Sequence, residues 1–306
     1  MVVLRNKFEG VVVAVLTPFT QEGKVDEGAL SEHLIYLVKN RVNGLFILGT
    51  TGLGPALALD EKKKVVDLAV DVVGGEAPVI VHVTDIVLPN VLELAKYASR
   101  KGVSAISITA PYFYNRVDEE ALYQFLKAVV EVSAVPVLLY NQPAYTGINI
   151  PVEIVRKLRS ESEVVAGIKD SSGNLTQIYN YIKVLKSDFG RDFTVLTGGD
   201  SLFYPALMLG ADGIVSALAN IVPELFIKLY ESFRGGDKSE ALSIQKRIDE
   251  LRSILKSYSQ LSAYYEAGRQ LGLSVGYPRL PIRRLSSSEV ADLRERLSRA
   301  GFLPEK

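Results

Sequence analysis

The chain has 306 residues, 48% of them hydrophobic, and 35 basic residues (Lys and Arg) balance 35 acidic ones. This composition can bury a large core, and the zero net charge gives no general attraction to nucleic acid or anionic membranes. The lack of cysteine excludes disulfides, thiolate metal sites and cysteine nucleophiles. We found no secretory signal and no apolar run of about 18 residues. A cytoplasmic protein without nucleic-acid or membrane partners is expected.

Short β-branched apolar runs alternate with amphipathic helical patterns along most of the chain, which is typical of βαβ units on a parallel sheet. The expected strands are residues 11–16, 44–49, 78–83, 105–109, 136–141, 165–169, 194–197 and 213–216. The expected helices between and after them are residues 26–39, 60–73, 89–100, 118–132, 151–160, 175–185, 201–209 and 223–233. Eight units predict a (β/α)8 TIM barrel in the class α/β, rather than an open doubly wound sheet, which more often has roughly five or six strands.

The strand pattern stops after Gly235, and only helical patterns follow, at residues 238–257, 263–271 and 287–300. We therefore divide the chain into a barrel, residues 1–235, and a C-terminal helical extension, residues 236–306. The charged residues 61–64 are expected to form a solvated helix face, and Arg283 and Arg284 lie in a proline-flanked loop without a catalytic role.

Lys169 stands near the end of an apolar strand, where a lysine is rarely buried without a partner. Free lysine has a pKa near ~10.4, and burial disfavours its charged form, so such a site can hold a neutral amine that attacks a carbonyl. The alternative is a side chain with its stem packed and its head in water. The strand alone favours neither interpretation.

All eight strands of a barrel end at one rim, so residues at their carboxyl ends converge on one site. Tyr140 ends the fifth strand, Thr50 and Thr51 follow the second, and Tyr112 and Tyr114 follow the fourth. Ser216 ends the eighth strand, and Ser171 lies two residues beyond the sixth. These side chains are expected around Lys169.

Glycines and hydroxyls alternate in the segment Gly49-Thr-Thr-Gly-Leu-Gly, where backbone amides can approach a carboxylate closely. The segment lacks the order of a Walker loop or a dinucleotide turn, and a tight strand-to-helix turn is the alternative. Tyr140 is a candidate proton shuttle, although a tyrosine at a strand end is usually packing.

Metal chemistry finds little support in the sequence, because His33 and His82 form no spaced pair and no carboxylate cluster accompanies them. Both histidines are expected in the core or on the surface, and no metal is expected. Asp170, Ser171 and Ser172 are expected to cap the next helix.

Four ordered motifs carry a resemblance: GTTGLGP at 49–55, YNQPAYTG at 140–147, GIKDSSGN at 167–174 and GYPRLP at 276–281. Together they resemble the dihydrodipicolinate synthase and N-acetylneuraminate lyase superfamily. The resemblance implies a pyruvate-handling class I aldolase without a cofactor, assembled as a homotetramer. It implies that Lys169 forms the Schiff base, that Tyr140 relays protons with Thr50, and that Thr51 and Thr50 hold the pyruvate carboxylate.

The assignment of the chain to one branch of the superfamily depends on single residues within these motifs. The leucine at position 53 resembles the residue found in archaeal 2-keto-3-deoxygluconate aldolases, whereas synthases carry Glu at this position. Tyr145 stands where synthases place an arginine that holds the aldehyde's carboxylate. Phe113, Gln142 and Ser171 depart in turn from those aldolases, and KDSSGN is more synthase-like.

We expect a class I aldolase that cleaves or forms a 2-keto-3-deoxy sugar acid of the 2-keto-3-deoxygluconate type from pyruvate and an aldehyde. The alternatives are a dihydrodipicolinate synthase that condenses pyruvate with aspartate semialdehyde, and a non-catalytic barrel that binds a keto acid. The expected substrate-binding residues, with Tyr112 or Tyr114 acting in their own or a partner subunit's site, are Thr51, Gly49, Tyr112, Tyr114, Arg116, Gln142, Tyr145, Ser171 and Ser216. Arg116 in particular would meet a phosphate or carboxylate, or only a surface acid.

Overall fold

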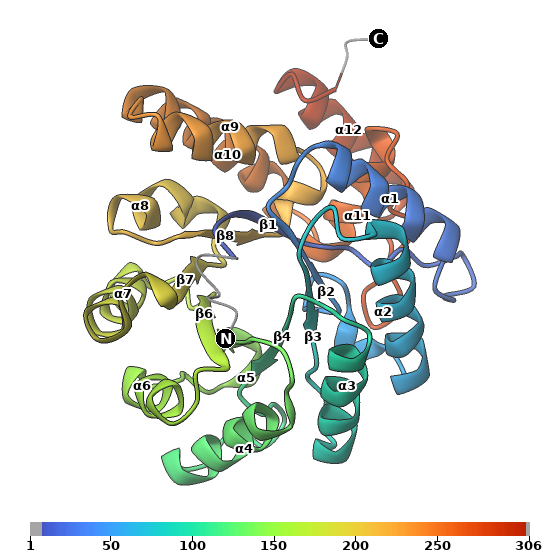
Figure 1. Ribbon diagram of the computed structural model, residues 1–306. Helices are drawn as coiled ribbons and strands as arrows, with labels where there is room; N and C mark the ends of the chain where they lie inside the picture. The colour runs from blue at the N-terminus through green and yellow to red at the C-terminus, as the bar shows by residue number, and fades with distance from the viewer. Residues whose placement is uncertain (1–7, 304–306) are drawn as a thin grey trace.

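The computed structural model describes residues 8–303. Eight parallel strands pair in chain order, and the eighth pairs with the first, so the sheet closes into a barrel (Figure 1). The strands are β1 (Gly10–Ala14), β2 (Gly44–Ile47), β3 (Val79–His82), β4 (Ala105–Thr109), β5 (Val137–Asn141), β6 (Val165–Asp170), β7 (Thr194–Thr197) and β8 (Gly213–Ser216). The predicted TIM barrel is confirmed.

Helices surround the strands in a ring, and each strand is followed by at least one of them (Figure 1). They are α1 (Glu27–Lys39), α2 (Leu59–Val73), α3 (Leu88–Arg100), α4 (Glu119–Val132), α5 (Pro143–Thr146), α6 (Val152–Glu161), α7 (Leu175–Phe189), α8 (Phe203–Met208) and α9 (Pro223–Arg234). Short 3₁₀ turns lie at η1 (Gly54–Ala56), η2 (Gly190–Asp192), η3 (Asp200–Leu202) and η4 (Leu218–Asn220). The one-turn helix α5 and the turns η1, η2 and η4 were not predicted, because they are too short to show a hydrophobic period, whereas η3 overlaps the start of the expected helix 201–209.

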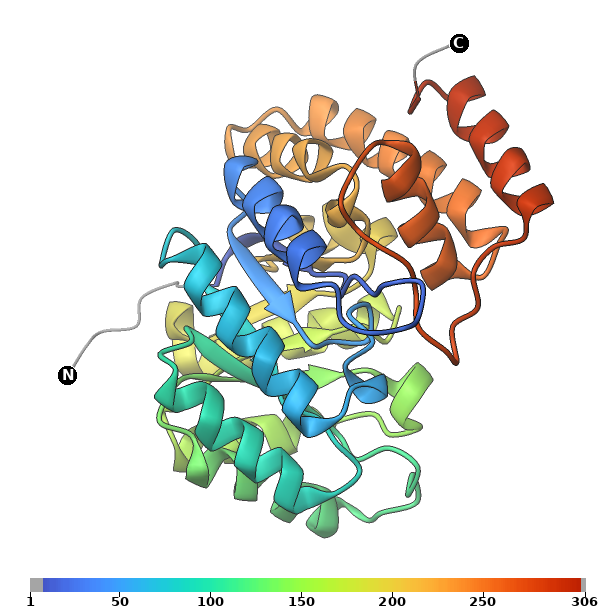
Figure 2. The same cartoon turned by 90° about the vertical axis from the view of Figure 1, so that its right-hand side faces the viewer.

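Three further helices follow the barrel: α10 (Lys238–Lys256), α11 (Gln260–Gln270) and α12 (Ser287–Arg299). They lie beside the end of the barrel toward which the strands run, and the segment between α11 and α12 passes along that end (Figure 2). The predicted C-terminal helices are therefore present, whereas the domain boundary after residue 235 remains a prediction.

A β-bulge in β6 decides which side chains of that strand face the barrel interior. Ala166 belongs to the interior cluster and Lys169 faces the same interior, although residues three apart in a regular strand point to opposite faces. The pairing explains this, because Val137 is opposite Val165 while Leu138 is opposite Gly167. The extra residue reverses which side chains at the end of the strand face the interior, and it brings Lys169 opposite Tyr140.

Side chains fill the barrel interior, so the barrel is a packed core and not a pore. The interior cluster begins with Phe8 and includes Phe46, Leu138, Tyr140 and other strand residues, all at most 9% exposed. Apolar helix faces pack on the outside of the strands. This packing holds the carboxyl ends of the strands rigidly around the cavity described below.

Candidate active site

Lys169 is 4% exposed and lies among aromatic rings at the mouth of the barrel. Its Nζ lies 3.9 Å from the ring centre of Tyr140 and 4.4 Å from that of Phe46. Among the described residues no carboxylate forms an ion pair with it. A buried amine that lacks an ionic partner fits the nucleophile interpretation better than a snorkelling lysine, whose head would reach water.

Tyr140 is 2% exposed and pairs with Lys169 across the two neighbouring strands. Burial acts to raise the pKa of its phenol, but the positive charge of Lys169 and hydrogen bonding with Thr50, Ser171 and Lys169 outweigh burial, so the pKa is lowered. The Nε2 group of Gln142 donates a further hydrogen bond to the phenol oxygen across 3.2 Å. The hydroxyl is thereby held next to the amine in a form suited to exchanging protons.

The loop after β2 brings Thr50 and Thr51 to the same cavity. Gly49, at the start of this loop, lies against the ring of Phe46, and an added Cβ would be 2.7 Å from Phe46 Cε1. Gly49 does not line the cavity, so its visible effect is to leave room for that ring. Leu53 follows with a positive φ of 52°, which completes a tight turn.

The cavity has a volume of about 280 Å³ and is bordered by strand ends and by the C-terminal extension. The predicted site residues that line it are Thr50, Thr51, Tyr140, Gln142, Tyr145, Lys169 and Ser171. Gly198 also lines it, and a Cβ there would be 1.8 Å from Ser171 Oγ and 3.1 Å from Lys169 Cε. The missing side chain therefore provides the space in which the lysine stem lies.

Other predicted residues lie elsewhere. Tyr112, Tyr114 and Arg116 are on the loop after β4 and do not line the cavity, and the last two are exposed. Ser216 is fully buried behind the cavity and donates a hydrogen bond to Asp200. Substrate binding by these four residues remains a prediction.

Several cavity residues were missed in the sequence. Asp200, in the turn after β7, is 6% exposed, and burial raises its pKa to about 6, although the Ser216 hydroxyl and the charges of Arg252 and Lys169 act to lower it. Its place just beyond a strand end was the signal that could have found it. Arg252 and Tyr264 reach the cavity from α10 and α11, and nothing in their helical patterns marks them.

The predicted cap of the helix after β6 was wrong. The N-cap of α7 is Asn174, whose side chain accepts from the backbone of Thr176 and Gln177, whereas Asp170 accepts hydrogen bonds from Asn141 and Ser172. A glycine turn separates the serines from the helix, which moves its start downstream.

The charged residues 61–64 are not simply a solvated face. Lys62 is 2% exposed, and its Nζ lies 2.7 Å from Asp85, while Glu61 pairs with Arg279. Helical periodicity alone could not show that α2 turns this side toward the rim of the barrel.

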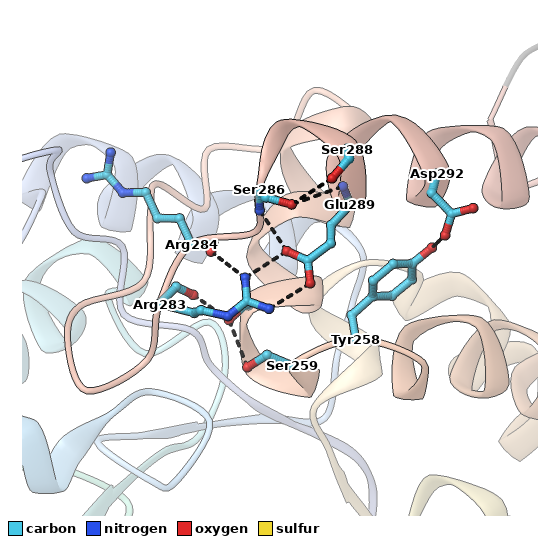
Figure 3. A network of polar contacts seen from close by, with 9 residues as sticks. Tyr258, Ser259, Arg283, Arg284, Ser286, Ser288, Glu289 and Asp292 are labelled. Atoms are coloured by element: carbon cyan, nitrogen blue, oxygen red, sulfur yellow. Dashed lines mark hydrogen bonds and ion pairs between the residues drawn. The ribbon is translucent and has the colours of Figure 1, made fainter.

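A polar network fixes the part of the extension that borders the cavity (Figure 3). The guanidinium of Arg283 donates two hydrogen bonds to Glu289 of α12, across 2.7 and 2.6 Å. The backbone carbonyl of Arg283 accepts a hydrogen bond from the hydroxyl of Ser262 in α11. Tyr258 at the end of α10 donates to Asp292 of α12. The network therefore holds two cavity-lining neighbours of these residues, Ser259 and Ile282, in place.

Among residues 8–303 no group of three or more His, Cys, Asp or Glu side chains is arranged to hold a metal ion. His82 is buried below the cavity, where burial first, and then the charges of Lys169 and Lys62, lower its pKa to about 3. Within the same described part of the chain, no helix has the length and apolarity needed to span a bilayer.

A closed barrel with a buried lysine, a tyrosine and paired threonines at its mouth defines a carbon–carbon lyase of the class I aldolase type. The Dihydrodipicolinate synthetase family model matches residues 7–300. The chain belongs to this family, as its motifs indicated.

The relatives divide between two activities. The chain is 36% identical over 288 residues to a 4-hydroxy-tetrahydrodipicolinate synthase of Archaeoglobus fulgidus, covering 94% of this chain and 96% of that one. It is 34% identical over 284 residues to a 2-dehydro-3-deoxy-phosphogluconate/2-dehydro-3-deoxy-6-phosphogalactonate aldolase of Sulfurisphaera tokodaii, covering 92% and 94%. Synthases are the more numerous among the compared relatives.

A solved structure gives the same fold. YagE, an E. coli K12 prophage protein of the dihydrodipicolinic acid synthase family crystallised with pyruvate, has a TM-score of 0.92 and 28% identity. The match covers 96% of this chain and 99% of YagE.

Proposed function

We propose that the protein is a cofactor-free class I aldolase in which Lys169 forms a Schiff base with pyruvate, and that it cleaves or forms a 2-keto-3-deoxy sugar acid. The observation that carries this proposal is the buried Lys169 Nζ, 3.9 Å from the ring centre of Tyr140, in a cavity that Thr50 and Thr51 also line. Pyruvate and its aldehyde partner are the substrates.

The proposed cleavage follows from the chemistry of the amine. The nitrogen of neutral Lys169 adds to the C2 carbonyl of the sugar acid, and loss of water leaves a positively charged iminium. Tyr140, with Thr50, removes the proton of the C4 hydroxyl, and the C3–C4 bond breaks with its electrons moving toward the iminium nitrogen. An aldehyde leaves, and a neutral enamine remains. Protonation of the enamine at C3 and addition of water then release pyruvate and free the amine.

The tail of the substrate is proposed from the polar groups beyond Lys169. The Oε1 atom of Gln142 is buried without a hydrogen-bond partner in the described structure, so a substrate hydroxyl would complete it. Asp200 and Arg252 border the same cavity and add an acceptor and a cation. A polyhydroxylated acid matches this mixture better than an apolar aldehyde would.

Dihydrodipicolinate synthase is the second candidate, and the prevalence of synthases among the compared relatives favours it. It would use the same lysine to join pyruvate and aspartate semialdehyde. Tyr145, which is 64% exposed and lines the cavity, replaces the arginine that synthases use for the aldehyde's carboxylate, and this substitution favours the aldolase.

Borohydride reduction in the presence of pyruvate, followed by peptide mass analysis, tests the Schiff base. We expect an adduct on Lys169 that is absent from Lys169→Met, and a slower adduct exchange in Tyr140→Phe. Pyruvate binding without an adduct would indicate the non-catalytic keto-acid-binding barrel instead.

Comparing pyruvate-dependent turnover of glyceraldehyde and of aspartate semialdehyde then separates the two enzymes. We expect glyceraldehyde to be turned over faster in the unmodified protein, and Tyr145→Arg to raise semialdehyde turnover relative to it. Faster semialdehyde turnover by the unmodified protein would make the synthase the correct assignment.

A further inference from the structure

The nitrogen of Lys169 is enclosed by aromatic rings. It lies over the ring of Phe46, 4.4 Å from its centre, as well as over that of Tyr140. Phe46 is fully buried, stacks on His82 with centroids 5.6 Å apart, and meets Tyr140 edge-on at 5.8 Å. Gly49 packs against its edge, so the ring has little freedom to turn away from the nitrogen.

The charged groups around this nitrogen do not neutralise it by direct pairing. The titratable groups that face it are His82 from β3, Tyr140 from β5 and Asp200 from η3, and Arg252 of α10 borders the same cavity. His82 is neutral near pH 7, and Asp200 makes its hydrogen bond to Ser216 rather than to Lys169. A buried cation without an ion pair needs another source of stabilisation.

An aromatic face supplies such stabilisation, because its negative quadrupole attracts a cation placed over it, and the attraction is larger where water is excluded. We propose that Phe46 is a catalytic residue whose ring face stabilises the positive charge on the Lys169 nitrogen, both in the ammonium and in the pyruvate iminium. The part that concerns the iminium rests on the proposed function. The part that concerns the ammonium does not.

The consequence for the reaction comes from which forms are charged. The ammonium and the iminium carry a positive nitrogen, whereas the attacking amine and the enamine are neutral. When the iminium loses a proton from C3, the C–H electrons form the C2–C3 double bond and the C=N pair returns to nitrogen. The face of Phe46 therefore favours the iminium over the enamine, and the ammonium over the neutral amine.

Fluorinated phenylalanines at position 46 test this, because fluorine withdraws electron density from the ring face and keeps the ring. Mono-, tri- and pentafluorophenylalanine would be introduced by nonsense suppression, with Phe46→Leu as the variant without a ring. Two probes would be followed against pH by peptide mass analysis of Lys169: borohydride trapping of pyruvate, and reductive methylation by formaldehyde with cyanoborohydride. The second probe reports the neutral amine whether or not a keto acid binds.

We expect the midpoint of both profiles to move stepwise to lower pH with each fluorination, by about half to one pH unit in total. Pentafluorophenylalanine in place of Phe203, which is also fully buried but stacks on Phe226 and Tyr230, is the matched control and should move neither midpoint. Unmoved midpoints in the Phe46 series, or an equal shift from Phe203, would overturn the inference. If pyruvate leaves no adduct on the unmodified protein while the methylation midpoint still shifts, the proposed function fails and the role of the ring in holding the charge stands.

Discussion

The hydroxyl of Ser216 donates a hydrogen bond to Oδ1 of Asp200 across 2.6 Å, and both residues are buried. Burial nevertheless raises the pKa of Asp200 from 3.8 to about 6. A carboxyl group with a raised pKa in the folded state destabilises the fold when it ionises. The free energy of unfolding should therefore fall as the pH rises through about 4 to 6, and the full cost is present above about 6.

Asp200→Asn tests this cost, because the amide oxygen still accepts from Ser216 while the charge is removed. A shift of about two pH units corresponds to roughly 3 kcal/mol, so we expect the variant to be more stable by up to that amount at pH 8 and equal to the unmodified protein at pH 4. Urea unfolding followed by circular dichroism at the two pH values gives the comparison. A stability difference of the same size at both would contradict the assignment.

Gly198→Ala should block the cavity without unfolding the barrel. Its Cβ would meet Ser171 Oγ at 1.8 Å and Lys169 Cε at 3.1 Å, so the lysine stem and the serine must move. We expect at least about a tenfold loss in the rate of pyruvate trapping, which corresponds to about 1.4 kcal/mol of barrier. Gly28→Ala in α1, where the nearest atom to the added Cβ is 3.6 Å away, is the control and should trap normally. Normal trapping by both variants would show that the space at Gly198 is not needed.

Lys62 and Lys63 are neighbours on α2 with opposite surroundings, which makes them a matched pair. The side chain of Lys62 is 2% exposed and pairs with Asp85, whereas Lys63 pairs with Glu93, of which 53% is exposed. We expect Lys62→Met to lower the free energy of unfolding by about 3 kcal/mol, since it leaves Asp85 partly buried and unpaired. Lys63→Met should cost about 0.5 kcal/mol or less.

The same pair predicts a pH dependence. Burial acts to raise the pKa of Asp85, and the hydrogen bond and charge of Lys62 outweigh burial and lower it. Without Lys62 the carboxylate becomes harder to ionise, so the loss of stability in Lys62→Met should be smaller at pH 4 than at pH 7. Urea titrations at both pH values measure this, and a pH-independent loss would mean that packing, not charge, dominates.

The expected homotetramer gives a further prediction, on the loop after β4. Phe113 and Tyr114 are 76% and 70% exposed, with ring centroids 5.2 Å apart, and Phe113 has a positive φ of 75°. A strained backbone that presents two aromatic rings to solvent fits a contact with a second copy of the chain. We expect light scattering to give four times 33.5 kDa, and Phe113→Ser with Tyr114→Ser to reduce that mass. Tyr179→Ser, on the exposed face of α7, should leave the mass unchanged.

The strands, the ring of helices and the place of Lys169 and Tyr140 were predictable, because apolar periodicity fixes a strand and barrel topology brings strand ends together. The bulge in β6 was not, since an extra residue in a strand leaves no mark in an apolar run. Phe46 falls within the expected strand 44–49 but was not singled out. Its place beside Lys169 depends on the register between β2 and β6, which are not neighbours, and periodicity carries no such information.

The far wall of the cavity shows the same limit. Arg252 and Tyr264 lie in helices whose patterns resemble any amphipathic surface, and only the packing of α10 and α11 against the barrel directs them inward. Lys62 was assigned to solvent for a related reason, because one helical turn of charged residues does not show which neighbour covers it.

The division of the cavity wall between two parts of the chain has a consequence for how such proteins diversify. The groups nearest the reacting carbon come from the strand ends, whereas Ser259, Tyr264 and Ile282 come from a segment more than 80 residues downstream of Lys169 that is held by its own polar network. Exchange of that segment between relatives would alter the aldehyde that is accepted and leave the bond-making step intact. Substitution in the barrel, as at Tyr145, and exchange of the segment that follows α9 are thus two separate routes to a new substrate.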